Sequence, residues 1–417
     1  MVCCLSIQLV GQLGPLPIDP NTRKGTLPNG LTYYVRANSE PKNQAEFFIA
    51  QKVGSIEELD NQRGLAHFLE HMAFNGLRHY PEKSLFTFTE SIGVKFGTNL
   101  NAYTSFEETV YNISAVPLSR EGIIDSCLLV LHDWADGLLL EPKAIDEERG
   151  VIREEMRTRN VAMLRVYQNL GYKVLPDNKY AYRWPIGTEE VIMNFQPQEL
   201  RDYYEKWYRP DHQAIIVVGD FNADIVENKI KTLFGDIEKP GTPSEIPTIT
   251  VEPNTTPIFA IETDPEMTST GISVNYKYDA LPKEVKLSAQ GLILNYFMDI
   301  ITAMYNARFQ EIVMKPNAPF SEASASTGGF FIVDAVNAFS VDANCKEGGI
   351  KDAYTTLLTE LARVKQHGFT ASEYERAKAN YLTNNVPKHG KITKRTLSKA
   401  FRTCCLTVRC RVSKPPL

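Results

Sequence analysis

The sequence of 417 residues has no apolar run long enough to cross a bilayer, so no transmembrane helix is predicted. It also lacks a C-x-x-C pair, and most of its cysteines lie near the ends of the chain: Cys3, Cys4, Cys404, Cys405 and Cys410. Cys127 and Cys345 lie within the expected folded body, each in or near an expected helix. The sequence therefore indicates neither a thiolate zinc site nor a disulfide framework.

A basic surface is also missing from most of the chain. The net charge is −5 although residues 388–417 carry nine Lys and Arg and no Asp or Glu, so the remaining residues carry −14. An acidic body does not favour nucleic acid as a partner and suits cationic peptides. The basic tail lacks apolar periodicity, and we expect it to be unstructured or aberrant. Residues 1–19 have an apolar stretch without a basic region before it, and are at best a remnant of an export signal.

The length exceeds what one hydrophobic core usually serves and predicts two domains. Residues 239–257 are rich in Pro, Ser and Thr without periodicity, which is typical of a linker. We therefore expect a first domain over residues 20–238, a second over residues 258–386 and a tail over residues 387–417.

The pattern of each domain mixes strands and helices. In the first, we expect strands and helices in this order: strands 30–35 and 45–50, a strand pair 94–104 and 109–116, helices 119–137 and 143–170, strand 215–220 and helix 223–234. The second repeats much of this order: strand 272–278, helix 283–311, strands 321–325 and 330–341, then two helices. Residues 371–377 also align with residues 144–150 without a gap. The repeat predicts an α+β fold of two similar domains, each a mostly antiparallel sheet packed with helices.

The segment 64–76 contains two histidines four residues apart with a glutamate before the second, the inverted H-x-x-E-H pattern. On a helix, His67, Glu70 and His71 share one narrow arc with Phe74. The other apolar residues face the other way: Leu65, Phe68, Leu69 and Met72. Two imidazoles one turn apart can hold one Zn²⁺ at roughly 2.0–2.1 Å each, with Glu70 as general base toward a water at the metal. Asn75 and Gly76 are expected to close the helix. The second domain lacks the pattern, so we expect one zinc per chain.

A simpler interpretation makes His67 and His71 ordinary helix residues and Glu70 a solvated charge. Chance produces the pattern in roughly one random chain in a hundred. The apolar surroundings favour the metal, because a buried imidazole pair and a carboxylate would be costly without one.

A catalytic zinc site needs a third protein ligand, and the expected helix from residue 143 offers several carboxylates. Glu148 and Glu155 lie seven residues apart and share one face with three apolar residues: Val151, Ile152 and Met156. Both carboxylates are therefore expected to point inward, where a cation would compensate them. For Glu148, an internal salt bridge, for example with Arg159, is an equally good interpretation.

At these residues the chain resembles the pitrilysin/insulinase family of zinc metallopeptidases over residues 20–385. The inverted motif, the segment from Glu148 to Glu155 and the polar strand 99–105 carry the resemblance. It implies that His67, His71 and Glu155 bind zinc, that Glu70 is the base and that Glu148 supports the site. It further implies that an extended peptide pairs with an edge strand that includes three residues: Asn101, Ala102 and Tyr103.

Members of this family build a closed chamber from four such domains, in one long chain or in two subunits. The resemblance therefore implies half of a clamshell metallopeptidase, whose partner is a second two-domain half, either a dimer partner or a C-terminal half. An Arg and a Tyr that hold the substrate carbonyl in the family match no position here. The resemblance to bacterial members implies the periplasm or cell envelope and leaves the cytoplasm open.

Together these features predict a zinc metalloendopeptidase that cleaves peptides or small unfolded proteins. The alternative is a non-catalytic partner or structural subunit of a related assembly, against which the complete set of zinc ligands argues.

Overall fold

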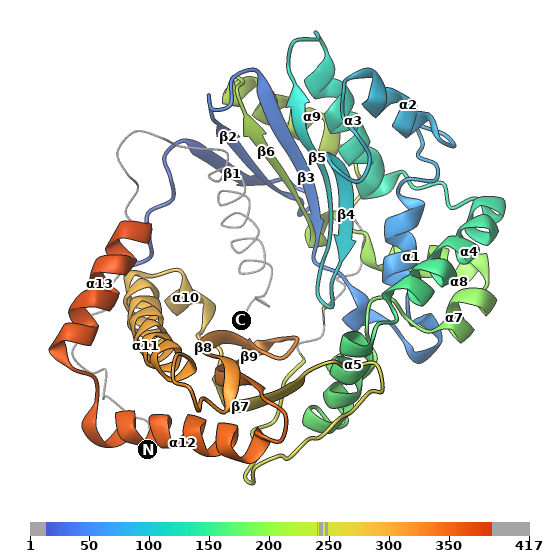
Figure 1. Cartoon of the computed structure of the whole chain (residues 1–417). Helices are drawn as coiled ribbons and strands as arrows, with labels where there is room; N and C mark the ends of the chain where they lie inside the picture. The colour runs from blue at the N-terminus through green and yellow to red at the C-terminus, as the bar shows by residue number, and fades with distance from the viewer. Residues whose placement is uncertain (1–13, 240, 242–244, 247–248, 386–417) are drawn as a thin grey trace. The chain divides into compact units, whose positions relative to one another are not determined.

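A computed structural model describes residues 14–239, 241, 245–246 and 249–385 (Figure 1). The terminal cysteines, the basic tail and most of the N-terminal segment lie outside the described residues. Among the described residues, no helix is long and apolar enough to cross a membrane. The chain forms two compact units, and we call the one that contains the H-x-x-E-H segment the motif unit and the other the second unit.

The motif unit contains Ile18–Val161 and the described part of Asp177–Thr248, and it is built on a six-stranded sheet in the order β1-β2-β6-β3-β5-β4. The strands have these bounds: β1 Thr22–Thr26, β2 Thr32–Ala37, β3 Gln44–Gln51, β4 Leu100–Thr104, β5 Thr109–Pro117 and β6 Gln213–Gly219. Only β2 and β6 pair in parallel in this sheet. All seven residues of β6 are buried, because side chains of this central strand enter an apolar cluster on each face of the sheet. At one edge of the sheet, β4 has a single strand neighbour.

Helices occupy the long connections of the motif unit. Its α-helices are α1 Leu65–Met72, α2 Ser84–Ser91, α3 Ile123–Asp136, α4 Pro142–Arg159, α6 Lys179–Tyr182, α7 Glu189–Asn194, α8 Pro197–Trp207 and α9 Ala223–Phe234. Three short 3₁₀ turns join them: Ser55–Glu57, Asp60–Gln62 and Pro210–His212. The main core contains Phe47 of β3, Phe68 of α1 and Trp134 of α3, all essentially fully buried. Because α1 contacts β4, α4 and α8, the motif lies between the edge of the sheet and a layer of helices (Figure 1).

The second unit contains Ala162–Pro176 and the described parts of Met1–Pro17 and Ile249–Lys391. Its sheet has the order β7-β9-β8, with bounds β7 Thr270–Asp279, β8 Phe320–Phe330 and β9 Val333–Cys345. Its helices are α5 Ala162–Val174, α10 Lys283–Lys286, α11 Ala289–Val313, α12 Ile350–His367 and α13 Ala371–Asn385. The two units therefore share a mixed α+β construction with largely antiparallel sheets, as the sequence predicts.

Two helices predicted as continuous are interrupted. The helix expected over residues 143–170 ends at Arg159, and α5 begins at Ala162 in the other unit. There the side chain of Arg165 pairs with Asp264 at 2.7 Å, and Lys173 pairs with Glu262 at 2.6 Å. The second helix is divided between α10 and α11, because Ser288 caps the N-terminus of α11. Cys345 ends a strand, although a helix was expected in or near its position.

Candidate metal centre

Helix α1 begins at a position that requires glycine. Gly64 has φ +103°, and a Cβ there would lie 3.0 Å from the Cα of Gly187. The carboxylate of Glu58 is fully buried and accepts the backbone N–H groups of Gly64 and Ala66 at 3.0 and 2.9 Å. Its two oxygens satisfy two N–H groups that have no partner within the helix. The start of the motif helix is therefore fixed by backbone and side chain together.

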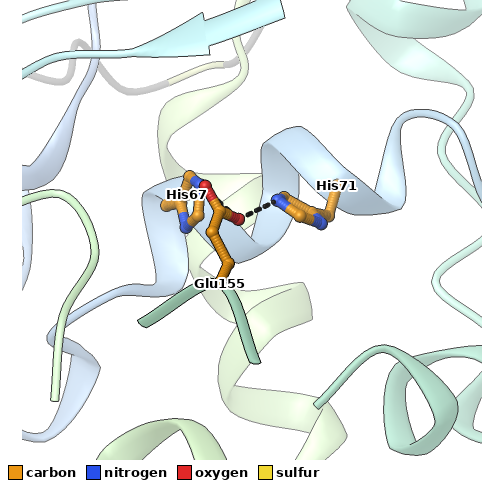
Figure 2. Close-up of side chains that lie close together, drawn as sticks. All are labelled: His67, His71 and Glu155. Atoms are coloured by element: carbon orange, nitrogen blue, oxygen red, sulfur yellow. Dashed lines mark ion pairs between the residues drawn. The ribbon is translucent and has the colours of Figure 1, made fainter. Parts of the chain in front are cut away.

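The apolar face of α1 is buried as predicted, and the opposite face presents the two histidines (Figure 2). The ring centroids of His67 and His71 lie 4.7 Å apart. His67 is 5% exposed, whereas His71 is half-buried. The spacing of one helical turn thus places both imidazoles next to each other on the same side of α1.

Glu155 reaches this point from α4 (Figure 2). Its Oε2 lies 3.6 Å from Nε2 of His67 and 3.2 Å from Nε2 of His71. Tetrahedral zinc with ligands at about 2.0–2.1 Å separates neighbouring ligand atoms by roughly 3.3 Å, so both distances fit a shared ion. Among the described residues, these three are the only His, Cys, Asp or Glu group found with suitable spacing, and their ligand atoms all lie within 4.8 Å of one another.

The charges at this point also suit a cation. Burial, together with the neighbouring His71, lowers the pKa of His67 to about 4, so its imidazole is neutral and able to coordinate. The hydrogen bond from His71 lowers the pKa of Glu155 to about 2. For His71, burial is outweighed by the carboxylates of Glu148 and Glu155, which raise its pKa to about 9. A metal would therefore displace a proton from His71 while Glu155 is already ionised.

Glu148 lies behind His71 and away from the ligand atoms. Its Oε1 is 2.7 Å from Nδ1 of His71, and its Oε2 accepts the Nδ2–H of Asn75 at 2.7 Å. A carboxylate on the second ring nitrogen orients a metal-binding histidine and fixes its tautomer. The proposed salt bridge from Glu148 to Arg159 is not formed, because Arg159 pairs with Oε1 of Glu155 at 2.6 Å.

Two details of the sequence interpretation were wrong. Val151, expected on the inward face with the two carboxylates, is 52% exposed, while Ile152 is fully buried. Helix α1 ends at Met72, earlier than expected, although Asn75 still bonds its end by donating Nδ2–H to the carbonyl of His71 at 3.3 Å. Asn75 also donates to Glu148 and accepts a hydrogen bond from Lys83 at 2.7 Å. The helical wheel gave the direction of each side chain only within a broad arc, and the loop after Met72 places Asn75 over α4.

Glu70 lies between the two histidines in sequence and faces the edge strand β4. The Oγ1–H of Thr104 donates a hydrogen bond to Oε2 of Glu70 at 2.6 Å. Burial raises the pKa of Glu70. Thr104 could not be identified from the sequence as a partner of Glu70, because this contact depends on the register of the β4–β5 hairpin, in which Thr104 lies opposite Thr109.

The predicted substrate strand forms an exposed edge beside Glu70. In β4, Asn101 lies opposite Asn112 of β5, and Ala102 lies opposite Tyr111. Asn101 and Tyr103 are exposed, with 42% of Tyr103 accessible. The N–H of Ala102 donates to Oδ1 of Asn101 at 3.0 Å, and the hydroxyl of Tyr103 donates to Glu108 at 2.9 Å. These residues are thus placed at an edge where an extended chain can approach.

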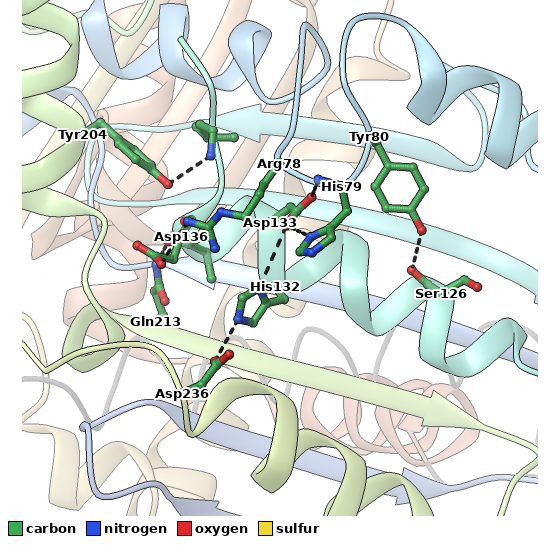
Figure 3. A network of polar contacts seen from close by, with 12 residues as sticks. Arg78, His79, Tyr80, Ser126, His132, Asp133, Asp136, Tyr204, Gln213 and Asp236 are labelled. Atoms are coloured by element: carbon green, nitrogen blue, oxygen red, sulfur yellow. Dashed lines mark hydrogen bonds and ion pairs between the residues drawn. The ribbon is translucent and has the colours of Figure 1, made fainter.

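A buried polar network fixes the loop that follows α1 (Figure 3). The carboxylate of Asp133 on α3 is fully buried, accepting the backbone N–H of His79 at 2.7 Å and contacting its ring Nδ1 at 2.8 Å. The neighbouring Trp134 donates its Nε1–H to the carbonyl of Ala73 at 3.0 Å. The end of the motif helix is therefore attached to α3 by hydrogen bonds.

Family models match both parts of the chain. Residues 33–180 match a model described as "Insulinase (Peptidase family M16)", and residues 194–381 match one described as "Peptidase M16 inactive domain". The H-x-x-E-H segment lies within the first match. The second match runs from the end of α7 into α13, and the described residues within it contain no comparable metal-binding group.

Relatives with names and solved structures agree with these matches. "Probable zinc protease PqqL" from Escherichia coli (strain K12) is 30% identical over 368 residues, covering 88% of this chain and 39% of the relative. The solved first half of the periplasmic protease PqqL from Escherichia coli superposes with a TM-score of 0.84 at 29% identity, covering 94% of this chain and 83% of that one. The structure of PqqL itself gives a TM-score of 0.85 at 28% identity, covering 96% and 45%. This chain therefore spans less than half the length of the relative it matches.

Proposed function

The chain belongs to peptidase family M16, and on that premise we propose that it is the catalytic half of a zinc metalloendopeptidase that cleaves peptides or small unfolded proteins. The observation that carries the proposal is the convergence of His67, His71 and Glu155 beside the carboxylate of Glu70. Two imidazoles and one carboxylate form a ligand set of catalytic zinc sites, which leave a fourth position open.

In this proposal, Nε2 of His67, Nε2 of His71 and the carboxylate of Glu155 hold one zinc ion per chain. When bound, zinc supplies a Lewis acid that polarises the scissile carbonyl and lowers the pKa of a coordinated water toward about 7. Glu148 holds the imidazole of His71 in one orientation through Nδ1. The ion pair with Arg159 engages one oxygen of Glu155 and leaves Oε2 directed at the histidines.

Glu70 acts as general base and then as general acid. Its carboxylate takes the proton of the attacking water and delivers it to the amine of the leaving peptide. Burial favours a proton-accepting role near neutral pH, because it raises the pKa of Glu70 above that of an ordinary glutamate.

We propose that the substrate binds as an added strand beside β4. Asn101, Ala102 and Tyr103 lie along the edge next to Glu70, and the Ala102 N–H now binds a side chain of its own strand. A substrate carbonyl would replace that side-chain oxygen, and the pairing would draw the peptide past the metal.

The remaining parts of the enzyme are proposed from the relatives. Because this chain corresponds to less than half of PqqL, we propose a second two-domain half as its partner, either in a dimer or in a longer polypeptide. That half would supply the Arg and Tyr donors for which we find no matching position here. We further propose a periplasmic location, as the name of the solved relative states for that protein.

Replacement of Glu70 by Gln tests the proposal, because it removes the base while conserving size. Zinc content and peptide affinity should be retained, and turnover should fall by orders of magnitude. Glu90→Gln, on the exposed side of α2, is the matched control and should retain turnover. Equal hydrolysis by wild type and Glu70→Gln would contradict the mechanism and favour a non-catalytic partner subunit.

A further inference from the structure

The carboxylate of Glu70 is held by a neighbouring strand and not by its own helix. Thr104 is the last residue of β4, and its Oγ1–H donates to Oε2 of Glu70 at 2.6 Å. Among the described residues, Thr104 has the only side chain that forms a hydrogen bond with the Glu70 carboxylate. Both residues are partly buried. The short bond between a hydroxyl and a carboxylate is of the charge-assisted kind, which is stronger than a neutral hydrogen bond.

We propose that Thr104 is a positioning residue for the general base, a role that rests on the function proposed above. The Thr104 hydroxyl donates its hydrogen bond to Oε2, so Oε1 of Glu70 remains available to accept the proton of the attacking water. The bond also restricts the rotation of a side chain that has three rotatable bonds. A base fixed in this way needs no reorientation when the water reacts.

The position of Thr104 also connects the base to the substrate. Asn101, Ala102 and Tyr103 precede it on the same strand, along the edge where we propose that the peptide pairs. The distance from the paired peptide backbone to Glu70 is then set by one short rigid segment, since the hairpin fixes Thr104 opposite Thr109. A serine retains the hydroxyl at this place, whereas a valine retains the shape and removes the hydrogen bond.

The experiment compares Thr104→Val with Thr104→Ser in zinc-loaded protein, with and without a candidate second half. Thr104→Val should lower kcat by about 10- to 100-fold with KM within about threefold, because the base is misplaced and the substrate edge is intact. Thr104→Ser should stay within about threefold of wild type. In a Glu70→Gln background, Thr104→Val should cause no further loss, since both changes act on one group. Zinc content and the free energy of unfolding identify any general damage.

A second readout does not depend on turnover. Crystal structures of the two variants should show the Glu70 carboxylate unchanged in Thr104→Ser and rotated in Thr104→Val. Failure of the proposed function would appear as normal hydrolysis by Glu70→Gln, whereas the position of the carboxylate decides the role of Thr104. An unmoved Glu70 in Thr104→Val with unchanged kcat, or equal losses in both variants, would overturn the inference.

Discussion

His71 uses its two ring nitrogens for two different carboxylates: Nδ1 lies 2.7 Å from Glu148, and Nε2 lies 3.2 Å from Glu155. In the proposed zinc site, this division would make Glu148 the group that orients His71 and Glu155 the group that shares the metal with it. It converts two inward-facing glutamates on one helix into two roles that mutation can distinguish.

Glu155→Gln should leave the protein without zinc after dialysis, because it removes one of only three protein ligands. Glu148→Gln should weaken zinc affinity by about 10- to 100-fold and keep the site, since it alters only the partner of a ligand. Metal analysis and competition with a chelator measure both effects. His67 and His71 variants should behave like Glu155→Gln. Full zinc occupancy in Glu155→Gln with an empty site in Glu148→Gln would show that the carboxylates are assigned in the wrong order.

Backbone N-methylation of a peptide substrate should weaken its binding at alternate residues. An added strand donates alternate N–H groups to its neighbour, and the exposed edge of β4 lies beside Glu70. A series of singly methylated peptides, compared by inhibition constants with the zinc-loaded protein, measures the periodicity. Equal affinity for every member of the series would exclude strand pairing.

The stability of the motif unit should depend on the protonation of Glu57. This carboxyl is 4% exposed; its Oε2 accepts the N–H of Gly54 at 2.8 Å, and its Oε1 has no hydrogen-bond partner among the described residues. Burial raises its pKa from 4.5 to about 8. The folded state therefore keeps the proton while the unfolded state releases it, so the contribution is full below about pH 4.5 and is lost as the pH rises toward 8.

Glu57→Gln should remove this loss and reduce the pH dependence of the free energy of unfolding between pH 5 and 8 by an amount on the order of a few kcal/mol. Urea denaturation at pH 5 and at pH 8 measures the free energy of unfolding of each protein. Glu90→Gln, at an exposed position, should follow wild type. Identical pH profiles for wild type and Glu57→Gln would show that Glu57 has an ordinary pKa.

The chain by itself should bind zinc well and cleave peptides slowly. One missing oxyanion donor typically costs about 10²–10³ in kcat, and the sequence offers no match for the donors expected from the family. Addition of a second two-domain half should raise the turnover in a concentration-dependent way. Titration with the second half, combined with sedimentation analysis, distinguishes activation by that half from self-association of the chain. Full turnover by a demonstrated monomer would contradict the requirement for a second half.

The convergence of residues at the candidate metal site was largely predictable because most of it is local. His67, Glu70 and His71 lie within five residues, and the geometry of one helix brings them together without knowledge of the fold. The third ligand could be narrowed to Glu148 or Glu155, because spacing along a helix gives the direction of a side chain but not the residue that it contacts. Thr104 could not be found in this way, because its contact with Glu70 requires the register of a hairpin more than thirty residues away.

Contacts between residues far apart in the sequence limited how well the bounds of the helices could be predicted. Helix α9 was expected with its observed bounds, because an isolated amphipathic pattern ends at a glycine there. By contrast, α5 was joined to α4 in the prediction. The helical period continues past Asn160, and only the tertiary partners of Arg165 and Lys173 show that α5 packs in the second unit.

Anomalous diffraction at the zinc edge, from crystals of the zinc-loaded chain, would locate the metal and identify its ligands. We expect one peak at about 2.0–2.2 Å from Nε2 of His67, Nε2 of His71 and the carboxylate of Glu155. In the same structure, Glu148 should contact His71 and not the zinc. A peak in the second unit, a peak bound by Glu148 in place of Glu155, or no peak at His67 and His71 would contradict this expectation.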